Sequence, residues 1–377
     1  MFFTASVAAS TETYREFVLR ANPEPPASLA GYALPPPPQQ LIEANERFLE
    51  AVTATRPPHV ISPTADARVA VPLLVQAVRD WSADGAQQRA ACYAPVVAAL
   101  RQRRLGSVFH PRLLVPGSGL GRLAFDLAAA FPGSNVVAME PDVHSQIVAS
   151  TLMQPSEEDC AADSCDAADA ADATTSAERR APPGQLELYP ALHLSTNWAL
   201  ASDRLRAVSV PDVPQPALAL AQRDANVSLV VGSFPDAIGQ AVAALAGASG
   251  GEQPDGGEKG GGGNGGFDAV ATVFFVDVLS DLVGALEKMH ALLAPRRGLW
   301  VNLGPLVFPL PHGELGGASA HPLPYDGLRA LVLASGFALL EERQAPCEYN
   351  HLPGQLERTL NTCFFFVAQP VEGAHGS

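Results

Sequence analysis

The sequence predicts an α/β protein with a Rossmann-like, seven-stranded, mostly parallel sheet, a terminal antiparallel hairpin and an N-terminal helical cap. Three features of the chain support this prediction. Short apolar runs alternate with helical patterns from residue 112 onward, a glycine cluster follows the first run, and no helix separates the last two runs. Continuously apolar strands that alternate with helices indicate a parallel sheet buried on both faces.

The first 110 residues are expected to form the helical cap. The stretch "PPPPQQLIEANERFLEAV" (35–52) opens with prolines and continues as an amphipathic helix. Residues 72–105 have apolar side chains at helical spacing and no strand pattern. We therefore divide the chain into an N-terminal arm, residues 1–110, and a sheet domain, residues 111–370, and expect the arm to pack on the sheet.

Seven apolar runs are assigned to the strands of the sheet domain, and helices follow most of them. The strands are expected at 113–116, 135–140, 227–232, 268–277, 298–304, 336–344 and 359–369. The helices are expected at 119–131, 142–153, 235–246, 280–294 and 325–335. Phe274 and Phe275 are expected in the core of the fourth strand. A parallel sheet finished by a hairpin-linked pair is typical of the class I methyltransferase fold rather than of a nicotinamide-binding domain.

Two low-complexity segments interrupt this pattern. Residues 155–184 are acidic and rich in alanine, and residues 247–266 are rich in glycine, so we expect both to be surface loops within one domain. They supply eight of the 15 net negative charges, which leaves the rest of the chain only mildly acidic. The chain has no basic stripe of the kind that nucleic-acid binding needs.

The composition indicates a soluble globular protein, with 47% apolar and 17% charged residues among 377. No apolar stretch approaches the roughly 20 residues needed to span a bilayer, and the N-terminus resembles neither a secretory signal nor a transit peptide. The five cysteines include no CxxC pair, which indicates free thiols in a reducing compartment and no metal site. We expect a cytoplasmic protein, with the nucleus as an alternative.

The glycine cluster in "RLLVPGSGLGRLAFDLA" (112–128) indicates a ligand site. Gly117, Gly119 and Gly121 directly follow a strand and precede a helix, so the backbone can approach a ligand and helix N–H groups favour an electron-rich partner. About twenty residues later Glu140 ends the second strand, where a carboxylate can accept hydrogen bonds from ribose hydroxyls. The pattern predicts an adenosine-containing cofactor and leaves NAD and S-adenosylmethionine open.

Three stretches resemble the carnosine N-methyltransferase family: "LLVPGSGLGRLAFDLA", "DAVATVFFVDV" and "GLWVNLGPLVFPL". The corresponding family stretches have the forms LVPGAGLGRLA, FFIDTA and WINLGPLLYH. The resemblance continues through "QAVRDWSADGAQQRAACYAPV" (76–97) and includes "YP" at 189–190 and "PDV" at 211–213. It therefore covers most of the chain apart from the two low-complexity segments and the first thirty residues.

The resemblance implies methyl transfer from S-adenosylmethionine to an imidazole nitrogen of carnosine or a related histidine-containing small molecule. The cofactor-binding residues that we expect are Gln76, Arg79, Gly117, Gly119, Glu140, Ser233, Phe234 and Val273. All except Gly119, which is added from its place in the glycine turn, match cofactor contacts of the family. Ser233 stands where the family has an acid, so its contact with the adenine is expected to be weak or through the backbone.

Asp277 and Tyr349 are the expected catalytic residues because they match family residues at the acceptor. A carboxylate that accepts the N–H of one imidazole nitrogen fixes the tautomer and makes the other nitrogen more nucleophilic. Phe308 and Pro309 replace a tyrosine and a histidine of the family. His312 is either a substitute for that histidine or a loop residue, so the identity of the acceptor stays open.

Other interpretations of these residues are considered as well. Glu140 and Asp277 could cap helices, Tyr349 could be an ordinary half-buried tyrosine, and Arg79 with Asp80 could lie on a solvated helix face. Two other functions remain: a methyltransferase with a different acceptor, such as a protein histidine or another small molecule, and a non-catalytic homologue that binds the cofactor.

Overall fold

The structure is a computed structural model that describes residues 12–29, 33–103, 105–154, 185–248, 266–308 and 322–371. The low-complexity segment at 155–184 and most of the one at 247–266 lie outside the described residues. The expectation of surface loops there stays a prediction.

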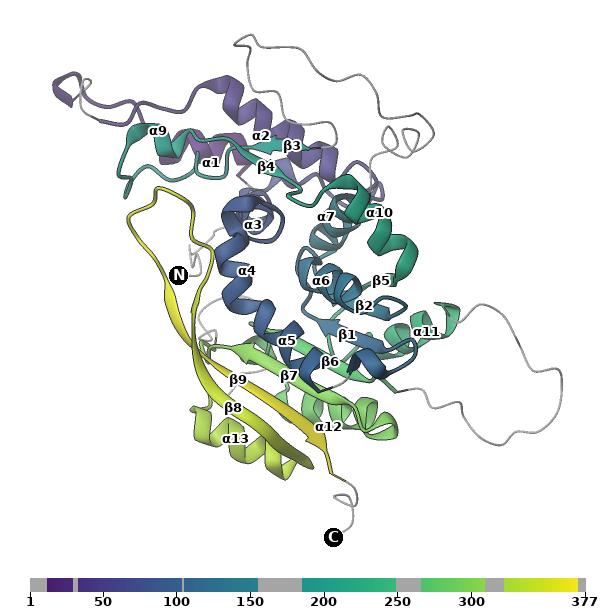
Figure 1. The fold of residues 1–377 in the computed structure, drawn as a ribbon. Helices are drawn as coiled ribbons and strands as arrows, with labels where there is room; N and C mark the ends of the chain where they lie inside the picture. Colours follow the sequence, from purple (N-terminus) through teal and green to yellow (C-terminus); the bar gives the residue numbers. More distant parts are fainter. Residues whose placement is uncertain are drawn as a thin grey trace, which may run out of the picture.

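Seven strands form one mixed sheet (Figure 1): β1 (Arg112–Pro116), β2 (Asn135–Glu140), β5 (Asn226–Val231), β6 (Ala269–Val273), β7 (Leu299–Gly304), β8 (Phe337–Glu348) and β9 (Leu360–Pro370). Their order across the sheet is β5-β2-β1-β6-β7-β9-β8. The first five strands in this order are parallel, whereas β9 is antiparallel to β7 and β8 is antiparallel to β9. This is the strand order of the class I methyltransferase fold, so the predicted fold class is confirmed. The order reverses between β1 and β6, and ligands of open α/β sheets bind at the carboxyl ends of the strands at such a point.

Helices cover both faces of the sheet (Figure 1). One face packs against α5 (Ala94–Gln102) and α6 (Arg122–Ala130), and the other packs against α11 (Ile238–Ala248), α12 (Leu282–Leu293) and α13 (Tyr325–Ala334). Alternate residues of β1 belong to the two cores. Leu113 and Val115 pack with α5 and α6, whereas Leu114 packs with α11 and α12, as the two-residue period of a strand requires.

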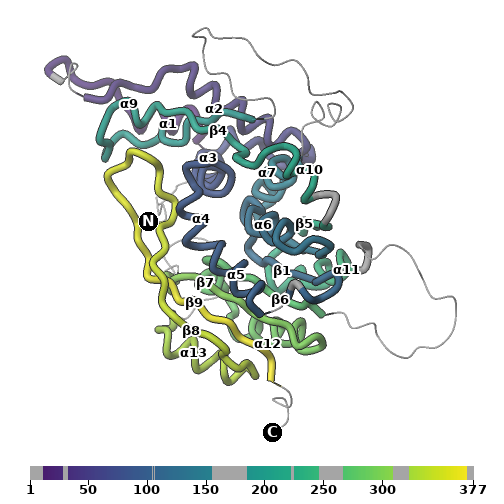
Figure 2. The backbone as a smooth tube through the Cα atoms, in the orientation of Figure 1, coloured from purple at the N-terminus to yellow at the C-terminus, as the bar shows by residue number. Residues whose placement is uncertain are grey.

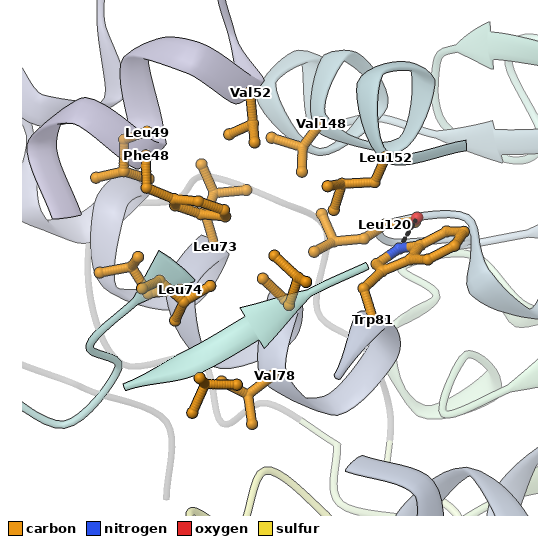
Figure 3. Packing of buried hydrophobic residues seen from close by; sticks show 14 of the residues in the cluster. Phe48, Leu49, Val52, Leu73, Leu74, Val78, Trp81, Leu120, Val148 and Leu152 are labelled. Atoms are coloured by element: carbon orange, nitrogen blue, oxygen red, sulfur yellow. Dashed lines mark hydrogen bonds between the residues drawn. The ribbon is translucent and has the colours of Figure 1, made fainter. Parts of the chain in front are cut away.

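A third core joins the N-terminal helices to the sheet domain. Its helices are α1 (Tyr14–Ala21), α2 (Gln39–Val52), α3 (Ala67–Trp81) and α7 (Val143–Met153). Figure 3 shows apolar side chains of α2, α3 and α7 that pack together, with Trp81 at one side of the cluster. The indole N–H of Trp81 donates to the carbonyl oxygen of Leu120 at 2.9 Å, and this bond ties the end of α3 to the glycine turn (Figure 3).

Residues after α7 contribute to the cap, and the sequence pattern did not predict this. A two-stranded antiparallel sheet of β3 (Leu186–Leu188) and β4 (Val208–Val210) belongs to the same core as α1 and α2, and Figure 2 shows β4 beside these helices. The Asn45 side-chain amide donates to the carbonyl oxygen of Tyr189 at 2.8 Å, and its oxygen accepts the Tyr189 N–H at 2.7 Å. The division into an arm of residues 1–110 and a sheet domain of residues 111–370 stays a prediction.

The structure corrects several predicted boundaries. The strand expected at 268–277 ends at Val273, because Phe274 has a φ of +52° and a 3-10 turn follows at Val276–Val278. The helix expected at 119–131 begins at Arg122, because Gly119 and Gly121 have positive φ.

Two further segments differ in how far their elements extend. The helical stretch expected at 72–105 divides into part of α3, then α4 (Ala86–Cys92), then α5. The strand expected at 336–344 continues to Glu348, because β8 stays paired with β9 as far as Leu360.

Candidate active site

A cavity of about 310 Å³ lies where the order of the sheet reverses. Its walls come from α3, α4, the glycine turn after β1, the end of β2, the turn after β6 and the loop after β8. Residues from both the cap and the sheet therefore line one space. The volume is at the lower end of the range for small-molecule sites.

The glycine turn has a backbone that residues with a Cβ would adopt only under strain. Gly117 has a φ of +65°, and a Cβ there would lie 2.6 Å from a ring carbon of Phe275. Gly119 has a φ of +53°, and a Cβ there would lie 3.4 Å from Oε1 of Gln76 and 3.7 Å from Nη2 of Arg79. The glycines thus form the turn and keep open the space between the sheet and α3. Three predicted residues, Gln76, Arg79 and Gly119, are brought together here.

Glu140 lies at the end of β2 and lines the cavity. Its Oε2 accepts the N–H of Gly119 at 3.0 Å, and its Oε1 accepts the N–H of Asp142 at 3.2 Å. Burial raises the pKa of this carboxyl group, and the two backbone donors oppose the rise. The side chain that caps α7 is Asp142, which accepts the N–H groups of His144 and Ser145, so the interpretation of Glu140 as a helix cap is wrong.

Arg79 and Asp80 are buried, with 8% and 0% of their surfaces exposed, so the interpretation as a solvated helix face is wrong. Nε and Nη2 of Arg79 donate to the two carboxylate oxygens of Asp80 at 2.8 Å each. Nη1 of Arg79 donates to Oδ1 of Asn350 at 3.2 Å. The Arg79 guanidinium therefore connects α3 with the loop after β8.

An aromatic pair forms part of the cavity wall. Phe274 stacks on Tyr349 with ring centroids 4.2 Å apart and ring planes 18° apart. The Arg79 guanidinium carbon lies 4.8 Å from the centroid of the Tyr349 ring, within the range of a cation–π contact. Val273, Phe274, Phe275 and Tyr349 all line the cavity. Phe274 and Phe275 both follow β6, so the expectation that they lie in the fourth strand is wrong, although Phe275 is buried.

Asp277 lies in the 3-10 turn after β6 and is 5% exposed. Its Oδ2 accepts the N–H of Val307 at 3.1 Å, and burial raises its pKa from 3.8 to about 6. Asp281 caps the following helix, since its side chain accepts the N–H of Gly284, so the interpretation of Asp277 as that cap is wrong. Asp277 does not itself line the cavity, whereas the adjacent Val278 does.

Comparison with known proteins identifies the family. A family model described as carnosine N-methyltransferase matches residues 58–161 and 178–372. The chain belongs to the carnosine N-methyltransferase family. The carnosine N-methyltransferase of Mus musculus is 25% identical over 276 residues, which are 72% of this chain and 55% of the mouse protein. That of Schizosaccharomyces pombe is 28% identical over 258 residues, which are 65% of this chain and 53% of the yeast protein.

The chain spans about half the length of these curated relatives. Among solved structures, a 1,6-didemethyltoxoflavin-N1-methyltransferase of Burkholderia thailandensis with bound S-adenosylhomocysteine is 15% identical. It covers 84% of this chain and 94% of its own chain, with a TM-score of 0.36. The fold is assigned from the order of the strands and not from this structural similarity.

Two of the expected cofactor-binding residues, Ser233 and Phe234, do not line the cavity. Oγ of Ser233 donates to Oδ2 of Asp236 at 2.6 Å. Phe234 is buried and packs edge-on against Phe275, with ring centroids 6.1 Å apart. Phe234 thus reaches the cavity only through Phe275, which also contacts the glycine turn.

Of the residues after β7 at which the sequence differs from the family, the structure describes only Phe308. Phe308 is 8% exposed, whereas Pro309 and His312 lie outside the described residues.

Cys92, Cys347 and Cys363 are free thiols, and Cys160 and Cys165 also lie outside the described residues. Within the described ranges, no three His, Cys, Asp or Glu residues are placed to hold a metal ion, and no helix is long and apolar enough to cross a membrane.

Sequence reasoning missed the contribution of α4. Gln88, Arg89, Cys92 and Tyr93 line the cavity, although they were assigned only to a helical arm. The "PDV" stretch of the sequence could have pointed to α4, because its Asp212 accepts hydrogen bonds from the guanidinium groups of Arg89 and Arg122. This carboxylate joins the segment after β4 to α4 and α6.

Proposed function

We propose that the chain is an S-adenosylmethionine-dependent N-methyltransferase that acts on an imidazole nitrogen of carnosine or a related histidine-containing small molecule. One observation carries the proposal: the cavity at the switch point of a class I methyltransferase sheet is lined by Gln76, Arg79, Gly119, Glu140 and Tyr349. These residues match, or lie beside, the positions that the family uses for cofactor and acceptor.

The residues fit the cofactor in their chemistry. The Glu140 carboxylate suits two ribose hydroxyls, and the Arg79 guanidinium with the Gln76 amide suits a carboxylate. Gly119 leaves room between these groups, because the Cβ of any other residue would lie 3.4 Å from Oε1 of Gln76. Bound there, S-adenosylmethionine would supply a methyl group on a positively charged sulfur, which an imidazole nitrogen can attack in line.

Asp277 is assigned to the acceptor imidazole because it matches a family residue at the acceptor and is adjacent to Val278, which lines the cavity. Its carboxylate would accept the N–H of one ring nitrogen and leave the other nitrogen as the nucleophile. The pKa of Asp277 is raised to about 6, and free imidazole titrates near pH 6.5. Above about pH 7 the pair is therefore in its reactive form, with the carboxylate ionised and the imidazole neutral. The rate should rise with pH between 5 and 7 and then level off.

The Phe274–Tyr349 pair would exclude water on one side of the reacting groups. Both rings line the cavity, and the Arg79 guanidinium lies over the Tyr349 ring and helps to fix its position. A site that aligns a neutral imidazole and keeps water out needs no strong base.

The proposal is tested with methyl-labelled S-adenosylmethionine and a panel of acceptors. The panel holds carnosine, histidine, other imidazole compounds and histidine-containing peptides, with a dipeptide that lacks imidazole as control. We expect label on carnosine or a related small imidazole, at a ring nitrogen located by NMR. Label confined to peptides would assign the chain to another acceptor. Tight cofactor binding with no transfer to any imidazole would contradict the proposed reaction.

A further inference from the structure

We propose that Asp80 is a positioning residue that orients the Arg79 guanidinium toward the carboxylate of the bound cofactor. The inference rests on the proposed function, and it adds a residue that contacts neither the cofactor nor the acceptor. It follows from the geometry around Arg79, the place of Asp80 in α3 and the burial of both side chains.

Asp80 holds the guanidinium by a bidentate pair. The two carboxylate oxygens accept from Nε and Nη2 of Arg79 at 2.8 Å each. Consecutive residues of a helix point in directions that do not face each other, so this pair forms only if the side chains bend together. Arg79 lines the cavity, whereas Asp80 does not.

The hydrogen-bond inventory of Arg79 leaves donors for a ligand. A guanidinium has five N–H groups, of which Asp80 takes two and Asn350 takes one on Nη1. One N–H on Nη1 and one on Nη2 are left. Nη2 faces the glycine turn, where a Cβ on Gly119 would lie 3.7 Å away. A carboxylate above Gly119 is thus within reach of a preset donor.

Asp80 is itself held by two residues outside α3. The hydroxyl of Tyr93, next to α4, donates to Oδ1 of Asp80 at 2.8 Å, and Nη1 of Arg122 in α6 donates to its backbone carbonyl at 2.7 Å. The carboxylate therefore has a fixed position from which to orient Arg79.

Helix stability does not explain an aspartate at this position. Asp80 is the second-last residue of α3, where the helix dipole disfavours a negative charge, and its surface is fully buried. A buried ion pair is also weak evidence for stability, because desolvation of both charges opposes their attraction. Orientation of the guanidinium accounts for the pair.

The substitution Asp80→Asn separates positioning from charge. If charge alone mattered, removal of Asp80 would leave Arg79 uncompensated and strengthen binding of an anionic group. If Asp80 positions Arg79, the same change weakens that binding. The two explanations predict opposite signs.

The experiment compares two ligands by calorimetry on the full chain. S-Adenosylhomocysteine carries an amino-acid group with the carboxylate, whereas 5′-methylthioadenosine has the same adenosine and thioether and lacks that whole group. We expect Asp80→Asn to raise the Kd of S-adenosylhomocysteine about 10- to 100-fold and to change that of methylthioadenosine less than about twofold. Asp268→Asn is the matched control, because the buried Asp268 pairs with Arg296 at 2.7 Å and neither residue lines the cavity. It should leave both values unchanged.

Should Asp80→Asn fail to fold, Tyr93→Phe removes only the hydroxyl that holds Asp80 and should weaken S-adenosylhomocysteine selectively, by a smaller factor. Equal losses for both ligands, or tighter binding of S-adenosylhomocysteine, would overturn the inference. A wild-type chain that binds neither ligand would overturn the proposed cofactor together with it. A wild-type chain that binds both but methylates no imidazole would contradict only the proposed reaction, and the Asp80 comparison would still decide.

Discussion

Replacement of Asp277 by asparagine should make the protein more stable and less active. Burial raises the pKa of this carboxyl group from 3.8 to about 6, so the folded chain disfavours its ionised form. The difference corresponds to ~3 kcal/mol. Between about pH 4 and pH 6 the folded chain binds the proton more tightly than the unfolded chain. The free energy of unfolding therefore falls as pH rises through this range and stays lower above it.

Asparagine is nearly isosteric, and its side-chain oxygen can still accept the N–H of Val307, but it carries no charge. Asp277→Asn should therefore increase the free energy of unfolding by up to ~3 kcal/mol at pH 8 and by about half as much at pH 5, as measured by urea denaturation. Methyl transfer should slow by roughly 100-fold, because the oriented negative charge at the acceptor is lost. Cofactor affinity should not change.

The control is Asp281→Asn. Asp281 lies four residues after Asp277 and caps α12, and asparagine caps a helix as well as aspartate does, so only the charge is removed. It should alter neither activity nor the pH dependence of stability. An Asp277→Asn variant with wild-type activity would show that the carboxylate does not orient the acceptor. A variant less stable than wild type at pH 8 would refute the argument from burial.

Three other outcomes are expected. Glu140→Gln should weaken S-adenosylhomocysteine binding by about 1–3 kcal/mol in calorimetry, because a charged acceptor for the ribose is lost; unchanged affinity would remove this residue from the site. Gly117→Ala should lower the melting temperature, because its φ is +65° and the new Cβ would lie 2.6 Å from an aromatic ring carbon. Gly239→Ala, in a helix with nothing within 4 Å of the new Cβ, should not lower it. S-Adenosylhomocysteine should slow alkylation of Cys92, which is 5% exposed and lines the cavity, but not of Cys363, which is 0% exposed and does not line it, as followed by peptide mass spectrometry. Equal protection of both thiols would indicate a general tightening of the fold instead.

The sheet could be predicted because neighbouring residues in the sequence determine each of its parallel strands. Each parallel strand is a short apolar run next to a helical pattern, and the glycine turn and Glu140 follow two of these runs directly. The exception was the strand expected at 268–277, which ends at Val273. Its apolar run continues through Phe274, but Phe274 has a φ of +52° and turns its ring onto Tyr349, 75 positions away in the sequence. No local pattern predicts that partner.

The wall formed by α4 could not be predicted for a related reason. Its residues belong to a helical segment, and only the tertiary fold brings Gln88 and Tyr93 to the cavity. Gln88 exchanges two hydrogen bonds with the backbone of His351, at 3.0 and 3.3 Å. Helical periodicity identifies such residues as part of a cap, but it does not identify the loop that they meet.

Five aspartates of the described residues differ in what their local structure needs. Asp66, Asp142 and Asp281 stand at helix starts, accept backbone N–H groups and keep contact with solvent. Asp80 and Asp277 are buried, one at the unfavourable end of a helix and the other in a turn where its pKa is raised. Buried carboxylates are frequent at functional sites, where folding alone does not favour them. Both of these lie next to residues that line the cavity, and a role there explains why the chain keeps two carboxylates whose burial lowers its stability.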